Sequence, residues 1–539
     1  MDKIRKILPG CVLVLLGILT FLYFADLKEV WFCDEIYSYE SANGVEQSWP
    51  AQTIGEWMSG GDIESFLAAD WDEFRLQYIM DVIYGDHVPL YFFVFRILGV
   101  LFFHGSASIW IGLSINLVFY LILLVLGYVF SYKLTGNSKA ALVLMLITSV
   151  VNRFMISQMT MLRMYMMLLC AEVLLILGAL WILREVKGKM RFLPFIYLYI
   201  ISIFGFLIHY DYWIFYAVTA TVFCCWLLFK AWKERGKKFF ATRTFGYVLA
   251  WGGNFVASLL TTILIFPYCR WNLNKGKGQT ALYSIIVFSK EKWENILWGY
   301  ERLAKGVFGN GMPTVLGLGI LFGCILGGGW LLVKRKEFAK ATGLFLTMAV
   351  TQAYQVVVCF TLPAEREERY LWGSSSIFFF CVCYGAFVLV RSVLPLVKKV
   401  WIRSVAVIVL VVGIVLGEWL VLDNGYNVPY LFHPDKDVEV LEEHGEVPWV
   451  VYGPTLGVYS YYDWLIPEKI CFFSLEEGAK EVSAAKELEG EACFVVYTYP
   501  DYIGQAEAFF EQCLGVELSN RYLTHSTNLG VFLLEVEKK

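Results

Sequence analysis

Long apolar runs separated by short polar segments extend over most of this 539-residue chain. About 20 consecutive apolar residues allow a helix to cross the hydrocarbon core of a bilayer. Eleven runs approach or exceed that length: 7–26, 109–132, 139–157, 162–183, 192–209, 212–230, 245–268, 313–333, 341–362, 370–392 and 402–422. The pattern therefore predicts an all-α polytopic membrane protein with about eleven transmembrane helices.

Composition agrees with an integral membrane protein. Hydrophobic residues make up 58% of the chain and charged residues only 17%, whereas soluble domains have about 25% charged residues. The first run follows a basic head, MDKIRK, and no small-residue cleavage site comes after it. We therefore expect a retained signal anchor rather than a cleaved signal peptide.

One further run, 89–105, is shorter and carries Arg96 near its middle. An arginine at the centre of a spanning helix costs about 2.5–3.5 kcal/mol on insertion scales. If this run does not cross, the strongly basic segments all fall on the side of the basic N-terminus: 131–139, 184–191, 230–243, 333–340 and 391–403. Basic loops are typical of the cytoplasmic side. We therefore predict a re-entrant or surface-lying helix at 89–105, on the outer face.

The last part of the chain has a different character. Residues 423–539 carry 21 acidic and 7 basic side chains, whereas residues 1–422 carry a net charge of +10. Five strand-like runs (448–453, 469–474, 492–499, 520–525 and 530–537) alternate with helix-like segments near 455–465, 476–488 and 504–514. This alternation predicts a small C-terminal α/β domain with an accessory role. The charge division favours two compartments over binding to nucleic acid.

The predicted domains are a transmembrane domain over 1–422 and an extracytoplasmic domain over 423–539. Within the first, residues 27–108 form the first external loop, with juxtamembrane helices. The thirteen cysteines show no metal-ligand spacing, and those inside apolar spans are explained as small buried hydrophobes. No metal site is predicted, and the sequence does not indicate a divalent cation, although outer-face carboxylates are able to ligate one.

Under this topology, polar residues from distant parts of the chain gather at the outer membrane face. They are Asp34, Glu35, Asp86, His87, Arg163, Tyr165, His209, Arg369 and Tyr370. A carboxylate there can act as a general base, ligate a hard cation, or merely cap a helix. Arginine binds phosphate oxygens bidentately. A base together with phosphate-binding cations at a bilayer favours transfer of a group from a lipid-phosphate carrier.

Several segments resemble the C-type (GT-C) membrane glycosyltransferases, specifically the protein O-mannosyltransferase and aminoarabinose-transferase-like superfamily. They are CDEIYSYESANG (33–44), DHVPLYFFVFRILG and the following helix (from 86), MTMLRMYMMLLCAEVLLI (159–176), FLIHYDYWIFYAV (206–218) and ERYLW (368–372). The resemblance extends over about residues 1–390. Val88, Met161, Gly373 and Ser374 depart from the family pattern. The acidic tail matches no relative, so the resemblance does not indicate the acceptor.

The resemblance implies an inverting transfer of a sugar from a polyprenyl-phosphate donor to a hydroxyl of an extracytoplasmic glycan, lipid or protein. It implies a multi-pass protein of the plasma membrane, with the site outside. Asp34 would be the catalytic base, with Glu35 beside it. Arg163, Arg369 and His209 would bind the donor phosphate. Asp86, His87, Tyr165 and Tyr370 would order the loop or contact substrate.

Other interpretations of the same residues stay open. Tyr37, Tyr165 and Tyr370 are also explained by the interfacial aromatic belt. A glycan ligase or polymerase with a diphosphate-linked donor is one alternative, although its late outer loop with paired arginines has only a faint counterpart here. A lipid or glycan transporter is the other, although we find no internal repeat or paired broken helices of the kind that transporters show.

Overall fold

The computed structural model describes most of the chain: residues 2–28, 31–43, 53–68, 79–80, 83, 87–186, 191–270, 279, 289–361, 366–396, 399, 401, 409, 412–413, 415–417, 422, 428, 431, 435–454, 466–475, 478–526 and 529–537. The chain forms two compact units. The first comprises residues 1–26, 83–91 and 113–429, and the second comprises residues 27–82, 92–112 and 430–539.

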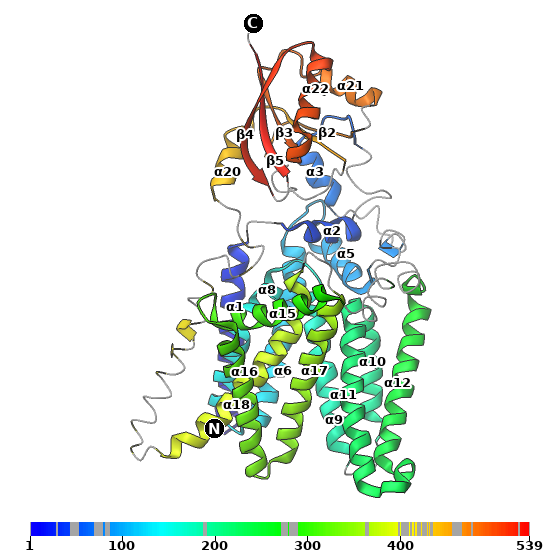
Figure 1. Ribbon diagram of the computed structural model, residues 1–539, viewed down its shortest axis with the longest axis vertical. Helices are drawn as coiled ribbons and strands as arrows, with labels where there is room; N and C mark the ends of the chain where they lie inside the picture. The colour runs from blue at the N-terminus through cyan, green and yellow to red at the C-terminus, as the bar shows by residue number, and fades with distance from the viewer. Residues whose placement is uncertain are drawn as a thin grey trace. The chain divides into compact units, whose positions relative to one another are not determined.

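The first unit is helical, and Figure 1 shows its long helices packed side by side. Its elements are α1 (Asp2–Asp26), α6 (Trp110–Thr135), α7 (Ser138–Met145), η1 (Leu146–Val150), α8 (Arg153–Thr160), α9 (Tyr165–Glu185), α10 (Leu193–Phe206), α11 (Tyr210–Arg235), η2 (Gly236–Ala241), α12 (Arg243–Ile265), α15 (Lys290–Phe308), α16 (Thr314–Lys334), α17 (Phe338–Thr361), η3 (Glu368–Leu371), α18 (Trp372–Val393) and η4 (Leu394–Leu396).

The protein is a multi-pass membrane protein. Among the described residues, eight helices are long and apolar enough to cross a bilayer: α1, α6, α9, α11, α12, α16, α17, and η3 to η4 as one span. The pair formed by Ser138–Val150 and Arg153–Thr160 is bent by 57° and gives a ninth if counted as one span. The predicted run 192–209 forms the shorter helix α10, and most of 402–422 lies outside the described residues. The predicted count of eleven is therefore not confirmed.

The predicted helix at 89–105 is present as α5 (Leu90–Phe102), most of which belongs to the second unit. Thirteen residues span about 20 Å, less than the roughly 30 Å hydrocarbon core of a bilayer. Arg96 is 1% exposed, and its guanidinium donates a hydrogen bond of 2.8 Å to the carbonyl of Ala42. Ala42 lies in the last turn of α2 (Cys33–Asn43), where helix carbonyls lack internal partners. Arg96 therefore provides a hydrogen-bond donor for a carbonyl at the C-terminal end of α2.

The second unit contains the predicted α/β fold. Its sheet has the order β2-β1-β3-β5-β4 and is formed by β1 (Trp449–Tyr452), β2 (Ile470–Phe473), β3 (Cys493–Thr498), β4 (Leu518–Ser526) and β5 (Leu529–Val536). β2, β1 and β3 are parallel, and β5 pairs antiparallel with β3 and β4. The other elements are α3 (Gly60–Leu67), α20 (Asp435–Glu442), α21 (Ala479–Lys486), η7 (Pro500–Tyr502) and α22 (Ile503–Leu514).

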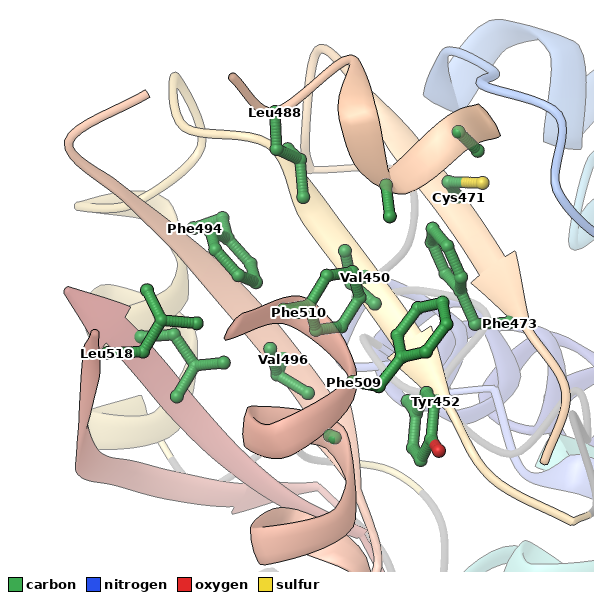
Figure 2. Close-up of a cluster of buried hydrophobic side chains, with 14 residues drawn as sticks. Val450, Tyr452, Cys471, Phe473, Leu488, Phe494, Val496, Phe509, Phe510 and Leu518 are labelled. Atoms are coloured by element: carbon green, nitrogen blue, oxygen red, sulfur yellow. The ribbon is translucent and has the colours of Figure 1, made fainter. Parts of the chain in front are cut away.

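The core of this domain lies between the sheet and the helices α21 and α22. Figure 2 shows Phe509 and Phe510 of α22 directed at Val450, Tyr452 and other strand side chains. All four side chains of β1 are buried, as expected for a parallel strand covered on both faces. All five predicted strands and two of the predicted helices are present, whereas the segment 455–465 lies outside the described residues.

A short segment between α2 and α3 joins this sheet. Ile54 and Met58 form bridges with Phe472 and Ile470 of the edge strand β2. The indole of Trp57 donates to the carbonyl of Ala484 at 3.0 Å. Loop residues 53–59 therefore protect one edge of the sheet, which otherwise presents unpaired backbone groups.

Candidate functional site

The position of Arg163 follows from the break between α8 and α9. The chain leaves α8 at Met161, whose backbone is extended, and α9 begins at Tyr165. The side-chain amide of Asn116 on α6 donates to the carbonyls of Met159 and Met161 at 3.1 and 2.6 Å. These bonds satisfy carbonyls that the end of α8 leaves open. Arg163 lies within the break and is 4% exposed.

Tyr165 brings three of the sequence motifs together. Its ring centroid lies 5.9 Å from that of His209, 6.5 Å from that of Tyr370 and 6.0 Å from that of Trp372. These residues come from the start of α9, the turn before α11 and the η3–α18 segment. Tyr165 and Trp372 are 3% and 1% exposed. Burial at this level argues for a packed cluster rather than membership of the interfacial aromatic belt.

His209 lies in the turn between α10 and α11 and is 9% exposed. The backbone N–H of Asp211 donates to its Nδ1 at 3.1 Å. The Asp211 carboxylate lies 3.3 Å from the same nitrogen. The orientation of the imidazole is therefore set by Asp211, on the first turn of α11.

Arg369 lies on η3 and is 7% exposed. Its guanidinium lies 3.7 Å from the Glu367 carboxylate and 5.3 Å from the centroid of the Tyr370 ring. The preceding Glu368 forms an ion pair of 3.1 Å with Arg153 at the start of α8. That pair joins η3 to α8, the helix that precedes the break in which Arg163 lies. Arg163, Tyr165, His209, Arg369 and Tyr370 thus all lie in the first unit.

Glu172 is a residue of this region that the sequence analysis missed. It lies on α9 seven residues after Tyr165, on the same face of the helix, and is 1% exposed. No hydrogen-bond partner of its Oε2 is found among the described residues. The carboxylate packs against Gly373, where any larger side chain would overlap it. An acid within an apolar span is a functional signal in itself, and this signal was available in the sequence.

Asp34 and Glu35 lie in the second unit, in the first turn of α2, and their surroundings differ. Glu35 is fully buried, and both of its oxygens lie 3.0 Å from the Lys28 ammonium. Its Oε2 also accepts the backbone N–H of Phe32 at 2.7 Å. Asp34 is half-buried, and its carbonyl accepts the hydroxyl of Ser38 at 3.1 Å. Lys28 precedes Asp34 by six residues and Glu35 by seven, and no pattern in the sequence connected it with them.

One further predicted site residue lies beside α5, and another is not described. His87, just before that helix, is half-buried, and Asp86 lies outside the described residues. In the part of the chain that the structure describes, no three His, Cys, Asp or Glu side chains are grouped so as to hold a metal ion.

Comparison with known proteins gives a match in structure but not in sequence. The sequence matches no known family and no curated protein. Among solved structures, ArnT from Cupriavidus metallidurans bound to undecaprenyl phosphate aligns over 97% of both chains, with a TM-score of 0.52 and 11% identity. The apo form of ArnT aligns over the same shares, with a TM-score of 0.50 and 12% identity. The chain therefore has an ArnT-like fold, which confirms at the level of fold the resemblance carried by the motifs.

Proposed function

We propose that this protein is an inverting glycosyltransferase that moves a sugar from a polyprenyl-phosphate donor to a hydroxyl group on an extracytoplasmic acceptor. The observation that carries the proposal is the cluster around Tyr165, which unites the Arg-x-Tyr, His-Tyr and Arg-Tyr segments in one place. Burying cationic side chains inside a helical bundle costs free energy. Folding alone therefore gives little reason to bring these distant segments together there, which favours a functional role.

The ArnT-like fold supports the donor class. One of the two aligned ArnT structures holds undecaprenyl phosphate, a polyprenyl phosphate. In our proposal the buried guanidinium groups of Arg163 and Arg369 bind the phosphate of such a lipid, and His209 assists them. Arginine suits this role because its planar fork matches two phosphate oxygens and keeps its charge when buried.

The proposed reaction needs one base and a site for the leaving group. The Asp34 carboxylate accepts the proton of the acceptor hydroxyl while the acceptor oxygen bonds to the anomeric carbon. The bond from that carbon to the phosphate oxygen breaks, and its electron pair leaves with the polyprenyl phosphate. The arginines stabilise the charge that develops on the departing phosphate. No general acid is required, because a phosphate is a good leaving group.

In this proposal, the two neighbouring acids have separate tasks. The Lys28 ammonium and the Phe32 N–H engage the Glu35 carboxylate, which then holds the start of α2 in place. Asp34 lies in the same helix turn but is less buried than Glu35, and we assign it as the base. Asp86 and His87 are proposed to order the loop before α5.

Turnover with defined donors tests the proposal. Purified protein in nanodiscs is incubated with a panel of polyprenyl-phosphate sugars and with matched diphosphate-linked sugars. Lipids that copurify with the protein are identified by mass spectrometry. We expect polyprenyl phosphate among these lipids and release of polyprenyl phosphate from at least one monophosphate donor. Turnover with diphosphate-linked donors alone would instead favour a ligase or polymerase.

A further inference from the structure

A buried polar seam lies between α15 and α17, outside the cluster around Tyr165. We define the α15–α17 seam by Lys292 and Gly299 on α15 and by Gln355, Cys359 and Phe360 on α17. Lys292 and Gly299 lie seven residues apart on the buried face of α15. The two helices approach closely at Gly299, where an added Cβ would lie 2.6 Å from the Cys359 sulfur and 3.5 Å from the Gln355 amide nitrogen.

Lys292 carries a buried ammonium group that forms no ion pair with any described residue. It is 9% exposed, and among the described residues no atom accepts a hydrogen bond from its Nζ. Its observed contact is with the ring of Phe360, whose centroid lies 5.7 Å away. A cation–π contact at that distance recovers only a small part of the cost of burying an ammonium group. Lysines in such positions normally pair or extend to solvent.

The acids nearest in sequence are engaged elsewhere. Glu294 lies 3.4 Å from Lys290 and 3.6 Å from Arg366, so its carboxylate serves two other cations. Glu291 is exposed at the surface of α15. Lys290, two residues before Lys292, is 93% exposed and has both solvent and Glu294 as partners. Two lysines on one helix thus differ in exposure and in ion pairing. The burial of Lys292 therefore results from its position in the seam and is not a general property of lysines on α15.

Gln355 is a second buried polar side chain of the seam that lacks hydrogen-bond partners among the described residues. It is 1% exposed, and neither its amide nitrogen nor its amide oxygen has a hydrogen-bond partner in the described part of the chain. Both amide atoms of Gln352, one turn earlier on α17, are in the same condition. Buried polar groups are almost always satisfied by protein, water or ligand. A seam whose cation and carboxamide have no hydrogen-bond partner among the described residues matches an anionic, oxygen-rich group.

We propose that the α15–α17 seam is a phosphate-binding site, in which the Lys292 ammonium pairs with the phosphate charge and the Gln355 amide donates to a phosphate oxygen. Lysine and amide donors are usual phosphate ligands. The phosphate belongs either to a lipid-linked sugar or to the headgroup of a phospholipid. The site does not depend on the glycosyl transfer proposed above, because its occupancy is measured by binding alone.

Thermal unfolding of the full-length protein tests this site. The protein is placed in nanodiscs of zwitterionic lipid and titrated separately with inorganic phosphate, undecaprenyl phosphate and phosphatidylglycerol. The variants are Lys292→Met and, as the matched control on the same helix, Lys290→Met. We expect at least one probe to raise the melting temperature of the wild type. Lys292→Met should lose at least tenfold in affinity for that probe, and Lys290→Met should keep it.

The sign of the stability change separates binding from a structural role. Without any probe, Lys292→Met should melt at the same temperature as the wild type or higher, because it removes an uncompensated buried charge. If Lys292→Met melts lower and keeps its affinity, or if no probe stabilises the wild type, the proposal is wrong. If Lys292→Met loses both stability and affinity, the same two measurements on Gln355→Leu distinguish a binding role from a structural one. Weaker binding at an unchanged melting temperature supports the site, and any other result overturns it.

The three probes also identify the source of the phosphate. Stabilisation by undecaprenyl phosphate but not by phosphatidylglycerol assigns the site to a lipid-linked sugar carrier. The reverse assigns it to a bilayer phospholipid. Stabilisation by inorganic phosphate as well shows that the phosphate group, rather than the lipid chain, is recognised.

Discussion

The ammonium of Lys28 lies 3.0 Å from both carboxylate oxygens of Glu35, and neither side chain is more than 1% exposed. This ion pair gives two acids that are neighbours in the sequence different surroundings. Glu35 has its oxygens occupied by Lys28 and by the Phe32 backbone N–H, whereas Asp34 is half-buried on the adjoining position of the helix. We therefore expect neutralising Glu35 to lower stability and neutralising Asp34 to lower the transfer rate.

Neutralising Glu35 should destabilise the second unit. Removing one partner of a buried pair leaves an uncompensated charge, at a cost of about 3–5 kcal/mol. Glu35→Gln should therefore melt well below the wild type, and the double variant Lys28→Met/Glu35→Leu should recover much of the loss. Glu56→Gln is the matched control, because Glu56 pairs with Lys480 at 3.0 Å while both side chains are more than half exposed. Exposed pairs contribute only about 0–1 kcal/mol.

The cost of Glu35→Gln should depend on pH. Burial lowers the pKa of the Lys28 ammonium, and the Glu35 carboxylate opposes that shift. Without the carboxylate the folded-state pKa should fall further below that of the unfolded chain. Lys28 then deprotonates in the folded protein as pH rises, and stability increases through that window. The difference in melting temperature between wild type and Glu35→Gln should narrow between pH 7 and about pH 9.5. A constant difference would contradict this prediction.

Neutralising Asp34 should impair catalysis instead of folding. Loss of a general base typically lowers the rate by about 10²–10⁴-fold. We expect Asp34→Asn to melt near the wild-type temperature, to bind donor lipid, and to lose at least about a hundredfold in transfer rate. The measurement is single-turnover transfer with saturating donor, together with a donor-binding titration. Near-normal transfer by Asp34→Asn would remove it from the role of base.

Replacing Arg163 should weaken use of the donor. A hydrogen bond to a charged group contributes about 1.5–3 kcal/mol, so Arg163→Ala should lose about 10- to 150-fold in kcat/KM for the donor. Arg163→Lys should recover only part of this loss, since lysine lacks the planar fork. Both variants are first checked by thermal unfolding. Unchanged donor affinity in a stable Arg163→Ala protein would exclude the phosphate role.

The packing of Gly373 against Glu172 should couple these two positions. Gly373→Ala would drive a methyl group into the buried carboxylate, and the displacement should reach Arg369 and Tyr370 just before it. We expect a lower melting temperature and a raised KM for the donor, both partly reversed by adding Glu172→Ala. Contacting residues show coupling of about 0.5–3 kcal/mol in double-mutant cycles. Gly319→Ala on α16 is the control, since no atom lies within 4 Å of its added Cβ.

The predicted topology is tested by reporter fusions. Alkaline phosphatase is active only outside the cytoplasm, so a fusion after Lys539 should be active. A fusion at residues 236–238, between α11 and α12, should be inactive. Activity at the second position with none at the first would mean that α5 crosses the membrane, and the proposed outer-face site would then be divided between two compartments.

Local patterns in the sequence were sufficient to identify most elements of secondary structure. Hydrophobicity sustained over 18 or more residues located all eight candidate spans in the described part of the chain, because each helix crossing a bilayer must be apolar along its own length. Alternating and fully apolar runs located the five strands of the tail in the same way. The motif residues Arg163, Tyr165, His209 and Tyr370 were found because they interrupt apolar spans or lie at the ends of them.

Pairings between side chains were decided only by the tertiary structure. Nothing in the sequence connects Lys28 with Glu35, Arg96 with the carbonyl of Ala42, or Glu172 with Gly373, because each contact depends on how helices or turns pack after they form. The same holds for loop residues 53–59, which add to a sheet edge more than 400 residues later in the chain. Periodicity reports which face of an element is apolar, whereas the partner of a buried charge is set by distances across that packing. The sequence therefore determined that Asp34 and Glu35 follow directly after the anchor helix. Only the fold determined that they lie in the first turn of a new helix, α2, and that Glu35 is the one held by a lysine.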